Sequence, residues 1–154
     1  MKSFNHEECE GLEDHEEDPF SPKRMRNASP LSPEAERVMQ ATIGCAIAVH
    51  RALGPGFLES IYRKAMSIEL ESRKMAYERE RSIDVTYRGI PIPGQRIDLI
   101  VGGLIVVELK AVSGFEETHR AQVISYLRTL RLRGGLLINF RVRVLKDGLR
   151  RIVL

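Results

Sequence analysis

Three charged side chains interrupt a stretch that otherwise has the composition of two buried strands. Residues 96–110 carry Ile-, Val- and Leu-rich runs on both sides of a Gly-Gly pair, which predicts a β-hairpin. Asp98, Glu108 and Lys110 fall inside these runs. Because a buried carboxylate is costly unless it is paired or holds a metal, the three charges indicate a chemical role.

The length of the turn decides whether the two carboxylates meet. Side chains alternate along a strand, so Glu108 and Lys110 project from the same face. A two-residue turn at the glycines would place Asp98 on the opposite face. A three-residue loop at residues 101–103, with Gly103 in a left-handed bulge, places Asp98 on the face of Glu108. We predict the odd-numbered loop.

A converging Asp and Glu pair would offer hard oxygen ligands to Mg²⁺ or Mn²⁺, with positions left for water and phosphate. The Lys110 ammonium would then orient or help to deprotonate the attacking water, which is the equipment for phosphodiester hydrolysis. The alternative is a surface hairpin with a salt bridge between Glu108 and Lys110, because exposed ion pairs are common and individually weak.

The spacing of Asp98, nine further residues and then Glu108-Leu109-Lys110 resembles the D…(D/E)xK signature of the PD-(D/E)XK nuclease superfamily. Ile97 stands where the signature has proline. The resemblance implies that Asp98 and Glu108 bind the metal and that Lys110 is catalytic. It also implies an α/β (α+β) fold, a restriction-endonuclease-like αβββαβ core whose mixed central sheet is flanked by helices.

A second motif lies at the start of a predicted helix. Residues 56–62 have the pattern Gly-x-x-Glu-x-x-Tyr, and with residues 50–55 they resemble the GxxExxY protein family, a branch of the same superfamily. The resemblance implies that Glu59 is catalytic and completes the metal ligands. Tyr62 shares its helix face and is a candidate for substrate binding or for support of the ligands. Taken alone, Glu59 is also explained as an acid favoured by the helix dipole.

A third motif lies on a later predicted helix. Gln122 and Tyr126 match the Gln-x-x-x-Tyr pattern of RecB-like nucleases, and their spacing places both on one helix face, with His119 one turn earlier. The resemblance implies that Gln122 and Tyr126 support the substrate or the catalytic lysine. His119 is a candidate phosphate ligand or supporting residue, although a lone histidine on a helix is more often structural. Arg120 departs from the acid that family members often carry there.

The elements that must position these residues are predicted in the order helix, helix, three strands, helix, strand and terminal hairpin. Ser32 is expected to cap the first helix, a Gly-Pro-Gly sequence at 54–56 to end it, and Gly134-Gly135 to end the third helix. The predicted helices cover 33–53, about 57–74 and about 116–132; the predicted strands cover 82–87, 90 through the central hairpin, and 136–140, with a hairpin over 141–154.

Charge divides the chain into two parts. Residues 1–20 hold eight acidic residues and one lysine, a net charge of −7, which leaves 23 basic and 13 acidic residues, or +10, for residues 21–154. The acidic, proline-containing residues 1–31 are predicted to be a disordered tail, and residues 32–154 a PD-(D/E)XK nuclease-like domain. A basic domain is an electrostatic argument for a polyanionic partner, although charge alone is also explained by solubility.

Cofactor, partner and compartment follow from the same patterns. No apolar run approaches the roughly 20 residues of a membrane span, and Cys9 and Cys45 lack the spacing of a zinc site or a disulfide framework, so a cytoplasmic protein without membrane contact is expected. The favoured function is a Mg²⁺- or Mn²⁺-dependent nuclease acting on nucleic acid, with DNA as the expected substrate. The alternative is a non-catalytic module that keeps this fold and binds nucleic acid or protein. The oligomeric state is left open.

Overall fold

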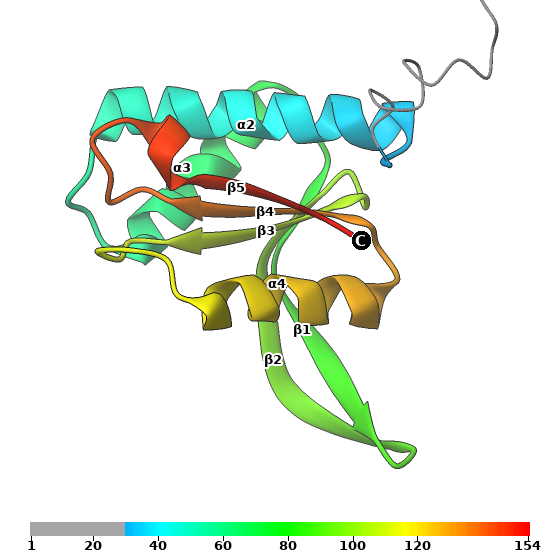
Figure 1. The fold of residues 1–154 in the computed structure, drawn as a ribbon. Helices are drawn as coiled ribbons and strands as arrows, with labels where there is room; N and C mark the ends of the chain where they lie inside the picture. Colours follow the sequence, from blue (N-terminus) through cyan, green and yellow to red (C-terminus); the bar gives the residue numbers. More distant parts are fainter. Residues whose placement is uncertain (1–29) are drawn as a thin grey trace, which may run out of the picture.

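The structure, a computed structural model, describes residues 30–154 (Figure 1). The prediction of a disordered tail at residues 1–31 therefore lies outside the described residues, except for the last two. The elements are α2 (Pro33–Leu53), α3 (Glu59–Ser72), β1 (Tyr77–Tyr87), β2 (Ile90–Val101), β3 (Ile105–Lys110), α4 (Glu117–Leu130), β4 (Gly134–Asn139), the 3₁₀ helix η1 (Leu145–Gly148) and β5 (Leu149–Val153). The predicted αβββαβ order is confirmed.

One five-stranded sheet, in the order β1-β2-β3-β4-β5, organises the fold. All neighbouring strands are antiparallel except β3 and β4, which are parallel and are joined through α4. Helices α2 and α3 cover one face of the sheet and α4 covers the other, while β1 and β2 extend beyond the sheet as a two-stranded arm (Figure 1). The mixed sheet flanked by helices is the predicted α+β fold.

Strand β3 is buried on both faces, and alternation of its side chains divides the core. Ile105, Val107 and Leu109 pack with residues of α2 and α3, whereas Val106 packs with residues of α4. The same alternation assigns Glu108 and Lys110 to the face of Val106. The charges at the end of an otherwise apolar strand are thus held between two packed layers.

The first helix begins and ends where its sequence predicts. The Ala35 N–H donates to Ser32 Oγ over 3.1 Å, and Gly54, in the left-handed region at φ 67°, follows the last helical residue. Leu31, which the sequence pattern assigned to the tail, is buried in the core beside Gly134. Helix α2 is therefore fixed at both ends, close to the sheet.

The prediction that Gly134 and Gly135 end the third helix is wrong, because both residues belong to β4. Helix α4 ends instead at Leu130, and its C-cap Arg131 is in the left-handed conformation at φ 56°. A Cβ on Gly134 would lie 2.7 Å from Ile105 Cδ1, and one on Gly135 would lie 2.7 Å from Val123 Cγ1. These glycines allow the neighbouring side chains to pack closely on the start of β4.

The predicted terminal hairpin is also wrong. Residues 141–144 form no strand, and η1 instead reverses the chain so that β5 pairs antiparallel with β4. Leu145, at the start of η1, is buried in the core, and the Phe140 N–H donates to Lys110 O over 2.9 Å. The chain after β4 is thus used to bury an apolar side chain and to tie β4 to the end of β3.

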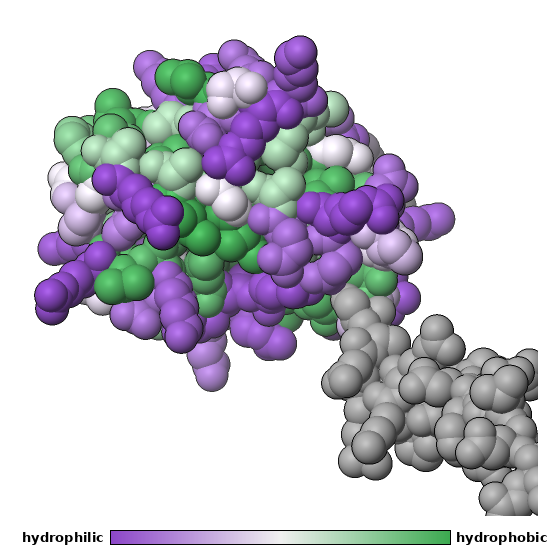
Figure 2. Space-filling model, turned by 90° about the horizontal axis from the view of Figure 1, so that it is seen from above, coloured by the Kyte–Doolittle hydropathy of each residue, from purple (hydrophilic) through white to green (hydrophobic). Residues whose placement is uncertain are grey.

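The surface mixes polar and apolar side chains. The face seen from above α2 has hydrophilic side chains spread between smaller apolar areas (Figure 2). Across residues 30–154, none of the helices combines the length and the apolar character needed to cross a membrane.

Candidate active site

The odd-numbered loop predicted between β2 and β3 is confirmed, one residue later than expected. Val101 stays in the ladder opposite Ile105, so the loop is residues 102–104, and both of its glycines are left-handed, at φ 61° and 65°. The Leu104 N–H closes the turn on Val101 O over 3.1 Å. This register places Asp98 across from Glu108.

Strands β2 and β3 separate at Asp98, and the aspartate fills the fork. The ladder between them runs only from Val101 to Leu99, after which β2 continues in contact with β1. In place of the next ladder bond, the Leu109 N–H donates to Asp98 Oδ2 over 2.8 Å. The carboxylate is buried, with 8% of the residue exposed. Asp98 is therefore fixed by backbone geometry at the point where the sheet opens.

The pKa of Glu108 is shifted by its surroundings in the fork. Burial raises its pKa to about 7, the nearby Asp98 charge raises it as well, and Lys110 opposes the rise. Its Oε1 lies 3.3 Å from Lys110 Nζ. Among residues 30–154, its Oε2 is a buried side-chain oxygen without a hydrogen-bond partner. A buried oxygen of this kind is suited to a proton or a cation.

Glu59 reaches the same fork from the first turn of α3. Burial raises its pKa, the Lys110 charge opposes the rise, and the Asp98 charge adds to it. The backbone of Ala111, directly after β3, also lowers the pKa of Glu59. The structure thus brings Glu59, Asp98, Glu108 and Lys110 into one electrostatic group.

Arg63 is a member of this group that the sequence reasoning missed. Its Nε donates to Asp98 Oδ1 over 2.8 Å, its Nη2 lies 3.6 Å from Glu59 Oε1, and its Nη1 lies 3.5 Å from Glu80 Oε1. Glu80 has φ 52°, a left-handed conformation that is rare in a strand residue with a side chain. The only sequence signal is that Arg63 follows Glu59 by one helical turn, which says nothing about Asp98, 35 residues away.

Helix α4 brings Gln122 and Tyr126 to the edge of the fork. Gln122 Nε2 donates to the Tyr126 hydroxyl over 2.8 Å, and that hydroxyl donates to Arg96 O over 3.2 Å, just before Asp98 in β2. Burial raises the pKa of Tyr126, and the Glu108 charge raises it further. Tyr126 therefore lies near the carboxylates and ties α4 to the strand that carries Asp98.

Two candidates have other contacts. Tyr62 is fully buried, stacks on Phe140 with ring centroids 4.3 Å apart, and donates its hydroxyl to Gly54 O, so direct substrate contact by Tyr62 is excluded. His119 Nδ1 accepts from the Glu116 N–H over 3.1 Å and completes a capping box at the start of α4. That His119 lines one cleft with Lys110 stays a prediction. Core burial and helix capping account for the two positions.

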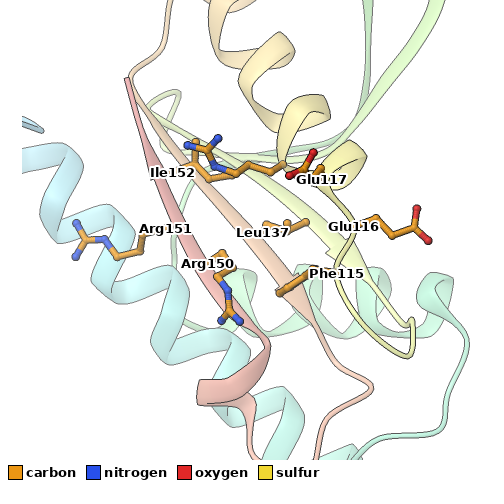
Figure 3. A pocket seen from close by; sticks show the side chains of 8 residues that line it. Phe115, Glu116, Glu117, Leu137, Arg150, Arg151 and Ile152 are labelled. Carbon is orange, nitrogen blue, oxygen red and sulfur yellow. The ribbon is translucent and has the colours of Figure 1, made fainter.

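A separate cavity of about 300 Å³ lies between the start of α4 and β5 (Figure 3). Arg150 lies over the Phe115 ring there, 5.4 Å from its centroid. The lining residues are Phe115, Glu116, Glu117, Arg120, Leu137, Arg150, Arg151 and Ile152. Since none of the fork residues is among them, this cavity is distinct from the fork.

The fork has features that fit a divalent metal and one that opposes it. In the part of the chain that the structure describes, no three His, Cys, Asp or Glu side chains are grouped as a metal site. The fitting features are the hard oxygens of Asp98 and Glu108 and the unpartnered Glu108 Oε2, and the opposing feature is the Arg63 guanidinium on Asp98. The residues fit a cation on the two carboxylates once Arg63 moves away from Asp98.

A mixed αβββαβ core with an aspartate at the fork and Glu-x-Lys on the next strand defines a nuclease-like class of protein. The family model of the PD-(D/E)XK nuclease superfamily matches residues 36–152, most of the chain, and the chain belongs to this superfamily. Neither the curated proteins nor the solved structures gave a match.

Proposed function

We propose that this chain is a Mg²⁺- or Mn²⁺-dependent nuclease that hydrolyses phosphodiester bonds of nucleic acid, with DNA as the expected substrate. The observation that carries the proposal is the buried pair of Asp98 and Glu108 beside the half-buried Lys110 at the fork, in which Glu108 Oε2 lacks a partner within the described residues. A carboxylate pair held beside a lysine in this way has the donor set that phosphodiester hydrolysis requires. Superfamily membership and the basic charge of residues 21–154 support the same function.

The roles follow from the positions of the side chains. Asp98 and Glu108 would hold the metal, and Glu59 would complete or orient its ligands. A bound divalent ion supplies Lewis acidity toward water and phosphate. Lys110, kept 3.3 Å from Glu108 Oε1, would orient the attacking water, and Gln122 and Tyr126 would contact the substrate or support the lysine.

Within the superfamily, we assign the chain to the GxxExxY branch, and the contacts of Tyr62 supply a physical reason for that motif. The Tyr62 hydroxyl donates to Gly54 O and accepts from the Phe57 N–H over 3.2 Å. The tyrosine thus holds the glycine-containing loop against the start of α3. The motif fixes the helix turn from which Glu59 projects.

A second candidate function is favoured by one observation. The Arg63 guanidinium neutralises Asp98 directly, so the fork has a cation of its own. A domain with this arrangement is able to bind nucleic acid or protein without metal chemistry, as a non-catalytic module that keeps the nuclease fold.

An assay of nucleic-acid cleavage distinguishes the two proposed functions. The purified chain should cut DNA in Mg²⁺ or Mn²⁺ and stop when EDTA is added, and Asp98→Ala should remove the activity because the variant lacks a metal ligand. A gel assay on single- and double-stranded DNA and RNA measures this, with Asp84→Ala, an exposed acid on β1, as the matched control. If the parent chain cuts no substrate with any divalent ion, and Asp98→Ala binds Mn²⁺ as well as the parent, the non-catalytic module replaces the nuclease.

Metal binding should depend on pH through Glu108. Its pKa of about 7 means that a metal has to displace a proton below pH 7, so Mn²⁺ affinity should rise about tenfold per pH unit between 5 and 7 and then level off. In the metal-free fold, this raised pKa contributes stability that is complete below the ordinary value of 4.5 and is lost as pH rises through about 7. Because Mn²⁺ binds more tightly when Glu108 is ionised, it should raise the unfolding temperature more at pH 8 than at pH 6.

Calorimetric Mn²⁺ titrations at pH 5.5, 6.5 and 7.5, in two buffers of different ionisation enthalpy, measure both the affinity and the released proton. Equal affinity at all three pH values would show that Glu108 does not exchange a proton for the metal.

A further inference from the structure

Arg63 joins three carboxylates that come from three different elements. Its contacts are Glu59 on its own helix, Glu80 on β1 and Asp98 on β2, and its side chain is only 20% exposed. The bond to Asp98, at 2.8 Å, is the short one, whereas the approaches to Glu59 and Glu80 are 3.6 and 3.5 Å. Arg63 is thus anchored on the most buried of the three acids.

The anchoring uses the oxygen that a metal would need. Asp98 Oδ2 is occupied by the Leu109 N–H, and Oδ1 is occupied by the Arg63 Nε–H. A divalent cation on Asp98 would meet a guanidinium in hydrogen-bond contact with the same carboxylate, and like charges at that distance repel. The two cations therefore compete for Asp98.

The structure also offers Arg63 a second position. Glu59 and Glu80 side chains are each 36% exposed, compared with 10% for Asp98, so the guanidinium spans from the buried end of the fork to its solvent side. A small outward movement would leave Asp98 while keeping carboxylate partners. At the solvent side an arginine is also well placed for phosphate, which its planar donors bind in pairs.

We propose that Arg63 is the resident cation of Asp98, that a divalent metal must displace it, and that the displaced guanidinium binds a phosphate of the nucleic acid. This rests on the proposed function, since it takes Asp98 as a metal ligand. Because nucleic acid draws Arg63 away from Asp98, and metal releases Arg63 toward phosphate, each ligand strengthens the binding of the other by the same factor.

The first test is calorimetric titration of the full chain with Mn²⁺ alone, at pH 8. Arg63→Gln should bind Mn²⁺ about 10- to 100-fold more tightly than the parent, which is the range expected from loss of one charge-assisted hydrogen bond. Arg63→Lys keeps a positive charge for folding but has a compact ammonium, and its affinity should fall between the two. Arg73→Gln is the matched control, because Arg73 caps the C-terminus of the same helix and pairs with Glu69, at 2.9 Å, and with Gly44 O, neither of which is a fork residue.

The second test repeats the titration with a phosphorothioate duplex that resists cleavage. In the parent, the duplex should tighten Mn²⁺ binding, and Mn²⁺ should tighten duplex binding by an equal factor. In Arg63→Gln, this coupling should fall to about one while Mn²⁺ still binds. Thermal unfolding measures whether each variant is folded. If Arg63→Gln is not folded, Arg63→Lys is used for the test in its place.

The outcomes separate this inference from the function on which it rests. If the parent, Arg63→Gln and Arg63→Lys bind Mn²⁺ equally and the parent cuts DNA, Arg63 does not compete with metal. The inference on Arg63 then fails, and the proposed nuclease function is kept. If neither the parent nor the Arg63 variants bind Mn²⁺, both the inference and the nuclease fail. Tighter Mn²⁺ binding in Arg63→Gln supports the competition even in an assay without cleavage.

Discussion

Lys110→Ala should abolish metal-dependent cleavage, with a loss of at least about 100-fold in the single-turnover rate, while Mn²⁺ binding persists. The carboxylates of Asp98 and Glu108 would bind the cation, whereas the ammonium acts on the attacking water, so the change removes only one part of the reaction. Calorimetry at pH 8 measures the Mn²⁺ affinity, because loss of the nearby Lys110 charge would raise the Glu108 pKa and weaken binding at lower pH. A gel assay measures the rate.

Two comparisons make this result specific. Lys64→Ala removes an exposed lysine of α3 and should leave cleavage unchanged. Asp98→Ala should lose both Mn²⁺ and cleavage, and its binding of nucleic acid without metal should tighten, because a charge that repels phosphate is gone. A parental cleavage rate in Lys110→Ala would exclude the lysine from the chemistry.

Gly148→Ala should destabilise the fold by about 3 kcal/mol or more, at the upper end of the range for overpacking. A Cβ at this position would lie 2.1 Å from the backbone oxygen of Asn139 and 3.0 Å from Val142 Cγ2, so β4 or η1 must move. Urea unfolding followed by circular dichroism gives the free energy of unfolding. Gly114→Ala is the control, because a Cβ there meets no atom within 4 Å, and its midpoint should stay near that of the parent.

The same change should weaken Mn²⁺ binding, because Asn139 holds the loop that follows Lys110. Its Nδ2 donates to Val112 O over 2.8 Å, and its Oδ1 accepts from the Val112 N–H over 3.1 Å. A displaced Asn139 would release this loop and Ala111, whose backbone lowers the pKa of Glu59. Parental stability in Gly148→Ala would mean that η1 adjusts without cost.

The features that depend on the spacing of nearby residues were predicted correctly from the sequence. The Ser32 cap and the glycine after Leu53 placed both ends of α2, and the odd parity of the β2–β3 loop placed Asp98 across from Glu108. The exact loop depended on a tertiary contact, because the Gly102 N–H donates to Ala76 O over 2.8 Å, which local sequence does not reveal.

Contacts between distant elements account for most of the rest. Gly134 and Gly135 have the composition of a helix stop, and only the packing of Ile105 and Val123 against them shows why a strand begins there. Helical spacing placed Tyr62 on a face near Glu59 but did not show that Phe140 covers it. Arg63 looked like an ordinary helix charge because its main partner is on another element.

The order of strands in the sheet equals their order along the chain, and this bears on the route of folding. Each strand pairs with the next one in sequence, so β1, β2 and β3 can assemble from short-range contacts. Helix α2 is different, because it packs on strand β4 and η1, and Glu36 meets Arg151 over a separation of 115 residues. Closing so long a loop costs chain entropy before its contacts form. We therefore expect docking of α2 to follow the strand hairpins and to limit the folding rate.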